Sequence, residues 1–247
     1  MSHATASTEG SAAIGACVET LDTPALLVDL DRLDRNLRAW QAAATAGGAR
    51  FRPHVKTHKI PAIAHMQAEL GACGIAAAKV SEAEPFAEAG LRDIVIAYPV
   101  VGERKWERVA ALAAGGPTVA VNVDSDGGAR GLSADAAAHG ARVGVQLEID
   151  SGFHRVGWMP TELDTIVGLA QLVESLPGLE LEGLTTHRGV FFAGAEGKTA
   201  DECGREEGQI LVDLAARLRE RGIEVRELTA GGTITGRGDI EHSMRPI

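Results

Sequence analysis

"DIVIAYPV", residues 93–100, is an almost unbroken apolar run, without the polar alternation of a strand that has one face in water. A run of this kind is typical of a parallel strand that is covered on both faces. Further β-rich runs recur along the chain, at 23–30, 49–58, 74–80, 118–124, 141–150, 181–187 and 224–232. The sequence therefore predicts a mainly parallel sheet.

Helical stretches separate these runs. The stretch 31–46 has apolar residues at the i, i+4 and i+7 spacing of one helix face. Two other helices are predicted from capping boxes at their starts, Ser81 with Glu84 and Thr199 with Glu202. The repeated βα units favour an α/β fold, a (β/α)8 TIM barrel, over a doubly wound sheet, because no G-x-G-x-x-G follows the first strand.

Composition limits the functional classes. The chain has 247 residues, 45% hydrophobic and 23% charged, which is typical of a globular protein. Its net charge of -10 disfavours nucleic acid and anionic membranes as partners. A charge of this size is also explained by good solubility alone. Three dispersed cysteines fit reduced thiols in a cytoplasm. Residues 1–20 carry no secretory signal and are predicted to be a disordered tail before a barrel domain over 21–247.

The stretch "RPHVKTHKIP", residues 52–61, concentrates basic side chains at a predicted strand end. Alternation along a strand would put His54, Lys56 and His58 on one face. A lysine amine buried there among polar groups can have a lowered pKa and act as a nucleophile. The alternative is a solvated strand end with loosely held cations.

Two more strand ends carry candidate ligand-binding groups. "TAGGT", Thr229 to Thr233, contains Gly231 and Gly232, whose backbone N–H groups could approach an anion; a plain βα turn is the alternative. "DSGFHRVGW", residues 150–158, contains Arg155, which could contact a ligand acceptor or form a loop ion pair with Asp150. His187, at the end of "LEGLTTH", is a further candidate, although a lone histidine is more often structural.

The three strand-end clusters complement one another. A nucleophilic lysine, a phosphate-binding turn and an arginine for a ring nitrogen are what pyridoxal phosphate requires. The stretches "TPALLVDLDRLDRNL", "RPHVKTHKIP", "GIAAAKVSEAE", "DIVIAYPVVG" and "TAGGTITGRG" resemble the D-threonine aldolase and D-serine dehydratase family of pyridoxal-phosphate enzymes, which have an alanine-racemase-type barrel. The resemblance runs from about Asp22 to Pro246.

The resemblance implies a role for each matching residue. Lys56 matches the lysine that holds pyridoxal 5'-phosphate as a Schiff base, and Arg155 matches the arginine facing the pyridine nitrogen. Gly231, Gly232 and Thr233, after Thr229, match the phosphate cradle. By the same resemblance, Thr186 and His187 end the strand that lies beside the cofactor, and His187 is a candidate general base. His54 and His58 would be polar support for the site.

The sequence departs from the family at its carboxyl end. The resemblance implies a further strand and a C-terminal β-rich domain after the matching "RP". In the family that domain carries the ligands of a divalent metal, Mn or Zn, and we expect no replacement for them in this sequence. By this reckoning the eighth barrel strand would begin near Arg245. Three explanations stay open: the run 23–30 closes the barrel, the barrel is incomplete at its last strand, or the chain is a fragment, which we favour.

The implied function is a lyase acting on small D-β-hydroxy amino acids, of the D-threonine aldolase type, which cleaves its substrate to glycine and an aldehyde. Alternatives are D-serine dehydration, a non-catalytic pyridoxal-phosphate-binding protein, and a barrel that binds another phosphorylated ligand without a Schiff base. The resemblance also implies a homodimer, although relatives use the C-terminal domain to complete it. We expect no nucleic acid and no membrane as partners, and a cytoplasmic location.

Overall fold

The computed structural model describes residues 15–241, which divide into a small unit up to Asn36 and a main unit from Leu37 onward. The small unit contains the 3-10 helix η1 (Val18–Thr20), and helix α1 (Leu30–Ala46) crosses the boundary. The prediction of a strand over 23–30 is wrong, because this run forms no strand and helix begins at its last residue. Pro24 in this run also has no N–H to donate to a strand ladder.

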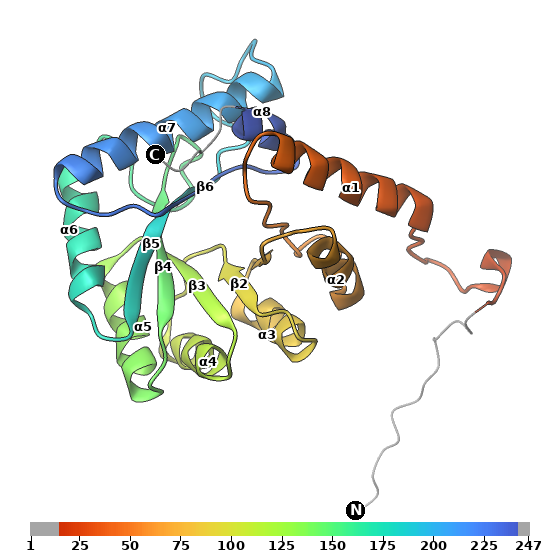
Figure 1. The fold of residues 1–247 in the computed structure, drawn as a ribbon, viewed down its shortest axis with the longest axis horizontal. Coiled ribbons are helices and arrows are strands. Elements are labelled where there is room, and N and C mark those ends of the chain that lie inside the picture. The colour runs from red at the N-terminus through yellow and green to blue at the C-terminus, as the bar shows by residue number, and fades with distance from the viewer. Residues whose placement is uncertain (1–14, 242–247) are drawn as a thin grey trace, which may run out of the picture. The chain divides into compact units, whose positions relative to one another are not determined.

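The main unit contains one sheet of six parallel strands that pair in chain order (Figure 1). The strands are β1 (Ile75–Ala77), β2 (Asp93–Ile96), β3 (Thr118–Val123), β4 (Val143–Ile149), β5 (Leu179–Thr186) and β6 (Glu227–Thr229). His54 adds an isolated parallel bridge to Ala76, so the chain before β1 also lies along the sheet. Over the described residues the sheet is a curled half-barrel, which confirms the predicted α/β barrel fold in a partial form. The strand expected near Arg245 lies outside the described residues.

Helices alternate with the strands, and those between β1 and β6 cover the outer face of the sheet (Figure 1). The helices of the main unit after α1 are α2 (Pro61–Glu69), α3 (Val80–Glu88), α4 (Glu103–Ala114), α5 (Asp126–Ala138), α6 (Leu163–Ser175), α7 (Ala200–Glu220) and α8 (Gly236–Glu241). Within residues 15–241, none of the helices combines the length and the apolar character needed to cross a membrane.

Capping explains where two helices begin. The predicted box at Thr199 and Glu202 is present, with each side chain bonded to the backbone N–H of the other residue. The predicted box at Ser81 is wrong, because α3 begins earlier, after Lys79. Glu82 there accepts the N–H of Ala78 at 3.0 Å. Glu84, the expected partner of Ser81, instead pairs with Arg108 on α4.

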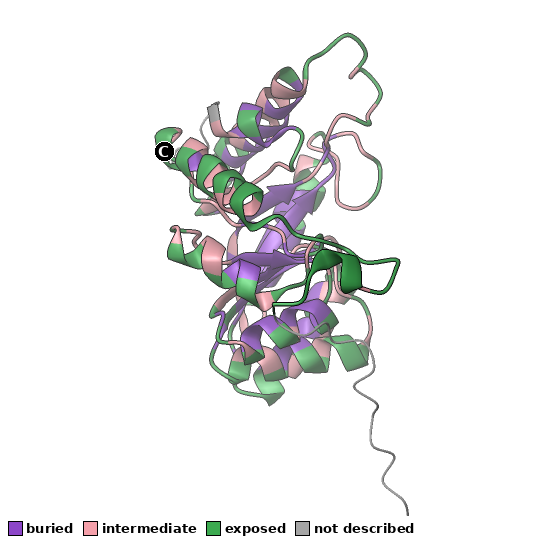
Figure 2. Cartoon of the chain, turned by 90° about the vertical axis from the view of Figure 1, so that its right-hand side faces the viewer, coloured by how far each residue is buried: buried purple, intermediate pink, exposed green. Residues whose placement is uncertain are grey.

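The core lies between the strands and the helices, and the strands are its most buried part (Figure 2). All seven residues of β4 are buried, as expected for a strand covered on both faces. Its outward side chains, such as Leu147 and Ile149, pack among apolar residues of α6 and α7. Burying one such side chain stabilises the fold by about 1.5–3 kcal/mol.

The inner face of the curled sheet carries charged side chains. Arg52 forms an ion pair with Asp93 of β2, and Arg50 forms one with Glu227 of β6. Burial and the negative charge of Glu227 raise the pKa of Glu182 on β5 to about 7. The Arg50–Glu227 pair therefore links the two ends of the half-barrel, the segment before β1 and the last strand.

Candidate active site

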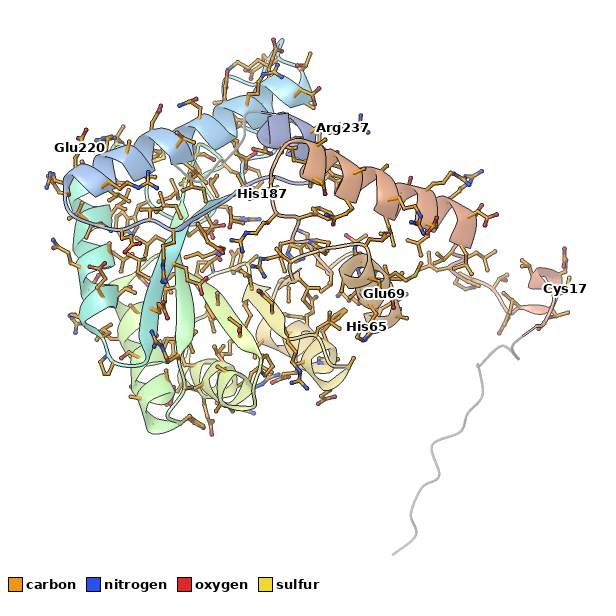
Figure 3. The ribbon with its side chains drawn as sticks, in the orientation of Figure 1. Cys17, His65, Glu69, His187, Glu220 and Arg237 are labelled. Atoms are coloured by element: carbon orange, nitrogen blue, oxygen red, sulfur yellow. The ribbon has the colours of Figure 1, made fainter. Side chains whose placement is uncertain are left out.

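The candidate site is built from the segments that follow the carboxyl ends of the strands, where α/β barrels hold their functional groups. His187 projects into this region from the end of β5 (Figure 3). Five segments contribute residues to this region. The residues are His54 and Lys56, Tyr98, Phe153 and Arg155, His187, and Gly231 with Gly232.

The segment of Lys56 differs from the prediction of three basic side chains on one strand face. The chain turns over Val55–His58, so the alternation ends at His54. His58 lies edge-on to Phe86 of α3, with ring centroids 6.3 Å apart, and is not beside His54. Lys56 is exposed, not buried as expected, and its N–H donates to His54 Nδ1 at 3.2 Å.

Electrostatics place the Lys56 cation close to two histidines. Burial, then the positive charge of Lys56, lowers the pKa of His54 to about 4. Burial also lowers the pKa of His187, and the cations of Arg155 and Lys56 act on it in the same direction. The cations of Lys56 and Arg155 therefore act on His187 from different segments. The imidazoles of His54 and His187 are both neutral near pH 7.

Arg155 does not form the ion pair with Asp150 that was considered as an alternative. Asp150 instead contacts His154 Nδ1 at 3.1 Å and accepts the N–H groups of Gly152 and His154. The Arg155 guanidinium lies 5.4 Å from the ring centroid of Tyr98 and 5.4 Å from that of Phe153. These cation–π contacts hold the guanidinium at the mouth of the half-barrel.

The imidazole of His187 bridges the ends of two strands. Its Nδ1 lies 3.1 Å from the carbonyl oxygen of Gly231, just after β6. Its ring lies edge-on to Phe153, with centroids 6.1 Å apart. A Cβ at Gly232 would come within 3.0 Å of His187 Cε1, so the loop after β6 approaches the ring at a distance that favours glycine.

The glycine loop, residues 231–233, meets part of the requirement for an anion cradle. Gly231 has φ +107°, which favours glycine, and its N–H faces the buried carboxylate of Glu207. Within residues 15–241, the backbone N–H groups of Gly232 and Thr233 donate no hydrogen bond. The cradle predicted from Gly231 to Thr233 therefore has two N–H groups to offer a ligand, with Gly231 turned toward the protein interior.

Two predicted threonines have different surroundings. The Thr186 hydroxyl is buried, donates to the Ile149 carbonyl at 2.7 Å and lies 2.8 Å from Ser151 Oγ. It therefore ties the ends of β4 and β5 together. Thr229 is the last residue of β6 and is half-buried.

Sequence reasoning missed three groups near the site. Tyr98 and Phe153 contact Arg155. Tyr98 lies in the apolar run 93–100 that predicted a strand, and Phe153 lies in the same loop as Arg155. Glu148 is buried below the mouth, and burial raises its pKa to about 7, although Asn122 donates to it and Arg155 lies near. Side chains alternate between the two faces of β4, and this alternation could have predicted that Glu148 points into the barrel.

These residues fit pyridoxal phosphate in kind. The aldehyde of the cofactor needs an amine, and Lys56 is exposed. Its ring nitrogen needs a polar partner, and the Arg155 guanidinium is held by two aromatic rings. Its phosphate needs N–H donors, and the glycine loop has two that form no hydrogen bond within residues 15–241. Among the residues that the structure describes, no three His, Cys, Asp or Glu side chains gather as a metal site.

A hollow of about 410 Å³ lies elsewhere, at the amino end of β5. It is lined by Glu174, Glu180 and Arg226 among others, and Glu180 pairs there with Arg226 at 2.7 Å. It lacks the convergent, unpaired groups of the strand ends, and we do not assign it a function.

Comparison with known proteins places the chain in a family. Residues 28–244 match the family model "Alanine racemase, N-terminal domain". The chain is 39% identical over 214 residues to a D-threonine aldolase of an Arthrobacter species, covering 86% of this chain and 55% of that protein. The chain thus spans about half the length of the curated relatives it matches.

Solved structures give the same result. The fold superimposes on a D-threonine aldolase from Filomicrobium marinum with a TM-score of 0.82 and 36% identity, covering 91% of this chain and 60% of that one. It superimposes on a D-threo-3-hydroxyaspartate dehydratase from Delftia sp. HT23 with a TM-score of 0.78 and 31% identity, covering 87% and 56%.

Proposed function

Because the chain belongs to the alanine racemase N-terminal domain family, we propose that it binds pyridoxal phosphate and cleaves D-β-hydroxy amino acids to glycine and an aldehyde. The observation that carries this proposal is the convergence of Lys56, Arg155, His187 and the glycine loop at the strand ends. The similarity to D-threonine aldolases supports the reaction type.

In this proposal Lys56 would hold the cofactor covalently through its amine. When bound, pyridoxal phosphate supplies the reactive aldehyde and a ring that accepts electrons from the broken bond. Gly232 and Thr233 would donate backbone N–H groups to the phosphate. Arg155 would interact with the ring nitrogen, where its cation would disfavour a second positive charge.

His187 is the proposed base. A carbonyl oxygen can only accept a hydrogen bond, so the contact with Gly231 assigns the ring hydrogen to Nδ1 and leaves Nε2 unprotonated. The lowered pKa keeps this nitrogen unprotonated, and so able to accept a proton, near pH 7. Nε2 can then take the proton of the β-hydroxyl while the Cα–Cβ bond breaks.

Titration with pyridoxal phosphate tests the cofactor part of the proposal. We expect a visible absorption band that borohydride abolishes, with the reduced cofactor on the peptide that contains Lys56. K56A should lose both signals. K59A, which changes an exposed lysine three residues away that pairs with Glu82, should keep them. Absence of cofactor on Lys56 in the wild-type protein contradicts the proposal.

Turnover is the second test. D-threonine is supplied with and without added Mn²⁺ or Zn²⁺, and glycine and acetaldehyde are measured. Cofactor attachment without turnover would favour a non-catalytic pyridoxal-phosphate-binding protein.

D-serine dehydration is the second candidate, and the similarity to the Delftia dehydratase favours it. In that reaction the α-proton and the β-hydroxyl leave, and pyruvate and ammonia form. Pyruvate from D-serine, without glycine from D-threonine, would select this alternative.

A further inference from the structure

We infer that Glu207 is a positioning residue for the candidate site, and that its carboxylate fixes His187 and the glycine loop relative to each other for cofactor binding. The inference rests on the proposed function for the identity of the ligand. It concerns a charge that lies outside the mechanism described above and contacts neither the substrate nor the cofactor.

Glu207 lies on α7 and is completely buried, with 0% of its surface exposed. Its Oε1 accepts the backbone N–H of Arg188 at 2.6 Å, and its Oε2 accepts the Thr235 hydroxyl at 3.2 Å. The N–H of Gly231 also faces this carboxylate. A buried carboxylate is costly unless donors surround it, and here the donors come from the segments after β5 and β6.

These contacts form a closed circuit. Glu207 holds the N–H of Arg188, which directly follows His187 in the chain. The His187 ring donates to the carbonyl of Gly231, and Thr235, further along the same loop, donates its hydroxyl to Glu207 again. Because the circuit is closed, the base and the glycine loop cannot separate without breaking one of these contacts. Helix α7 therefore sets the distance between two groups that the ligand must contact together.

Asp239 on α8 supports the same loop from behind. It is 2% exposed, and a Cβ at Gly231 would lie 2.9 Å from its Oδ2. No hydrogen-bond partner for either Asp239 oxygen is found within residues 15–241. Burial and the charge of Glu207 raise the pKa of Asp239 to about 8. Burial raises the pKa of Glu207 as well, but the N–H of Arg188 and the hydroxyl of Thr235 act in the opposite direction. Since neighbouring buried carboxylates resist joint ionisation, the donors favour the negative charge on Glu207 over Asp239.

The cation of Arg188 completes the surroundings of Glu207. Its guanidinium stacks 3.7 Å from the ring centroid of Phe192 and donates to the Cys203 carbonyl at 2.8 Å. The side chain of Arg188 is thus held by α7 and by the loop that contains Phe192. Its backbone N–H donates to Glu207. The segment after His187 is anchored at both its backbone and its side chain.

The experiment compares E207Q, E207D and E220Q. In E207Q an amide NH₂ replaces one oxygen and meets a donor, so the circuit opens. E207D keeps the charge on a shorter side chain. E220Q makes the same chemical change at the exposed far end of α7 (Figure 3). For each protein we would measure the Kd for pyridoxal phosphate, and amide hydrogen exchange without cofactor over residues 184–192 and 228–235.

We expect the Kd of E207Q to rise about 10- to 100-fold, the size of effect expected when buried donors lose their acceptor. Exchange should accelerate in both segments of E207Q, while β2 stays protected. E207D should recover part of the affinity, and E220Q should match the wild type. Unchanged affinity and exchange in E207Q overturn the inference, as does an E207D variant no better than E207Q.

The failure of the inference and that of the proposed function are distinguishable. If hydrogen exchange accelerates throughout the E207Q chain, that variant is unfolded. The Kd and the hydrogen exchange of E207D then decide whether Glu207 positions the site. A wild-type protein that binds no pyridoxal phosphate refutes the proposed function. In that case exchange in the two segments of the cofactor-free variants decides whether Glu207 positions them.

Discussion

His187 Nδ1 lies 3.1 Å from the carbonyl oxygen of Gly231, and this contact joins the end of β5 to the end of β6. The carbonyl selects the tautomer in which Nδ1 carries the hydrogen and Nε2 is free to accept a proton. A backbone atom of the glycine loop thereby prepares a side chain for base catalysis. Four predictions follow from this contact and its surroundings, beyond those made above.

The rate of D-threonine cleavage should fall only at acid pH. The pKa of His187 is lowered by burial and by nearby cations, so the ring stays unprotonated below its ordinary value of about 6.5. The acid limb of the pH–rate profile should therefore have an apparent pKa below that value. H187Q should remove this limb and lower kcat by about 10²- to 10⁴-fold. H139Q, at the end of α5, is the control that should keep the wild-type profile.

A methyl group at Gly232 should reduce activity more than stability. Its Cβ would lie 3.0 Å from His187 Cε1, so the ring must move and weaken its contact with Gly231. We expect G232A to lower kcat at least about 10-fold, since small displacements of catalytic groups have large effects. G168A, in α6 where a Cβ meets nothing within 4 Å, should instead stabilise the fold by about 0.5–1 kcal/mol. A G232A enzyme with wild-type kcat would contradict the assignment of His187.

Tyr98 should contribute to cofactor affinity through Arg155. Its ring lies 5.4 Å from the guanidinium, and such contacts are worth about 0.5–2 kcal/mol. Y98A should therefore raise the Kd for pyridoxal phosphate by about 2- to 30-fold, because Arg155 loses one of the two rings that hold it. Y98F keeps the ring and should bind as the wild type does. Equal losses in both variants would assign the effect to the hydroxyl, against this prediction.

Asp239 should make the free energy of unfolding fall as pH rises. Its pKa is about 8 in the fold, against an ordinary value near 3.8, so the folded state binds the extra proton between these pH values. Stability should decline from about pH 4 to pH 8 and then level off. D239N cannot ionise, so its advantage over the wild type should grow through this pH range and then stay constant above pH 8.

Denaturant unfolding at pH 5, 7 and 9 measures this difference. D164N is the control, since Asp164 pairs with Arg221 but its side chain is 87% exposed, and it should change stability by less than about 1 kcal/mol at every pH. An advantage of D239N that is the same at all three pH values would show that Asp239 does not carry the proton.

The sequence predicted the strands best where burial on both faces requires an uninterrupted apolar run, as in β2 and β4. The same signal failed at 23–30, because an apolar run becomes a strand only where a neighbour pairs with it. At Lys56 the strand alternation was extended past the point where the backbone turns, at Val55. A turn of this kind is stabilised by contacts with distant elements, such as the ion pair of Lys59 with Glu82.

The candidate site was predicted by position, because parallel strands bring their carboxyl ends together whatever the loops contain. Lys56, Arg155, His187 and Gly231 were found in this way. Tyr98 and Glu207 were not, because their roles depend on which loop or helix faces which. Nothing in the residues near Glu207 in the chain indicates that its carboxylate meets the N–H of Arg188.

The order of the strands has a consequence for how the protein is made. Each strand from β2 to β6 pairs with the strand just before it in the chain, and every neighbour is parallel. A chain emerging from the ribosome can therefore add one strand and one helix at a time to a surface that already exists. The half-barrel can grow by this route during translation, without any strand waiting for a partner from the far end of the chain.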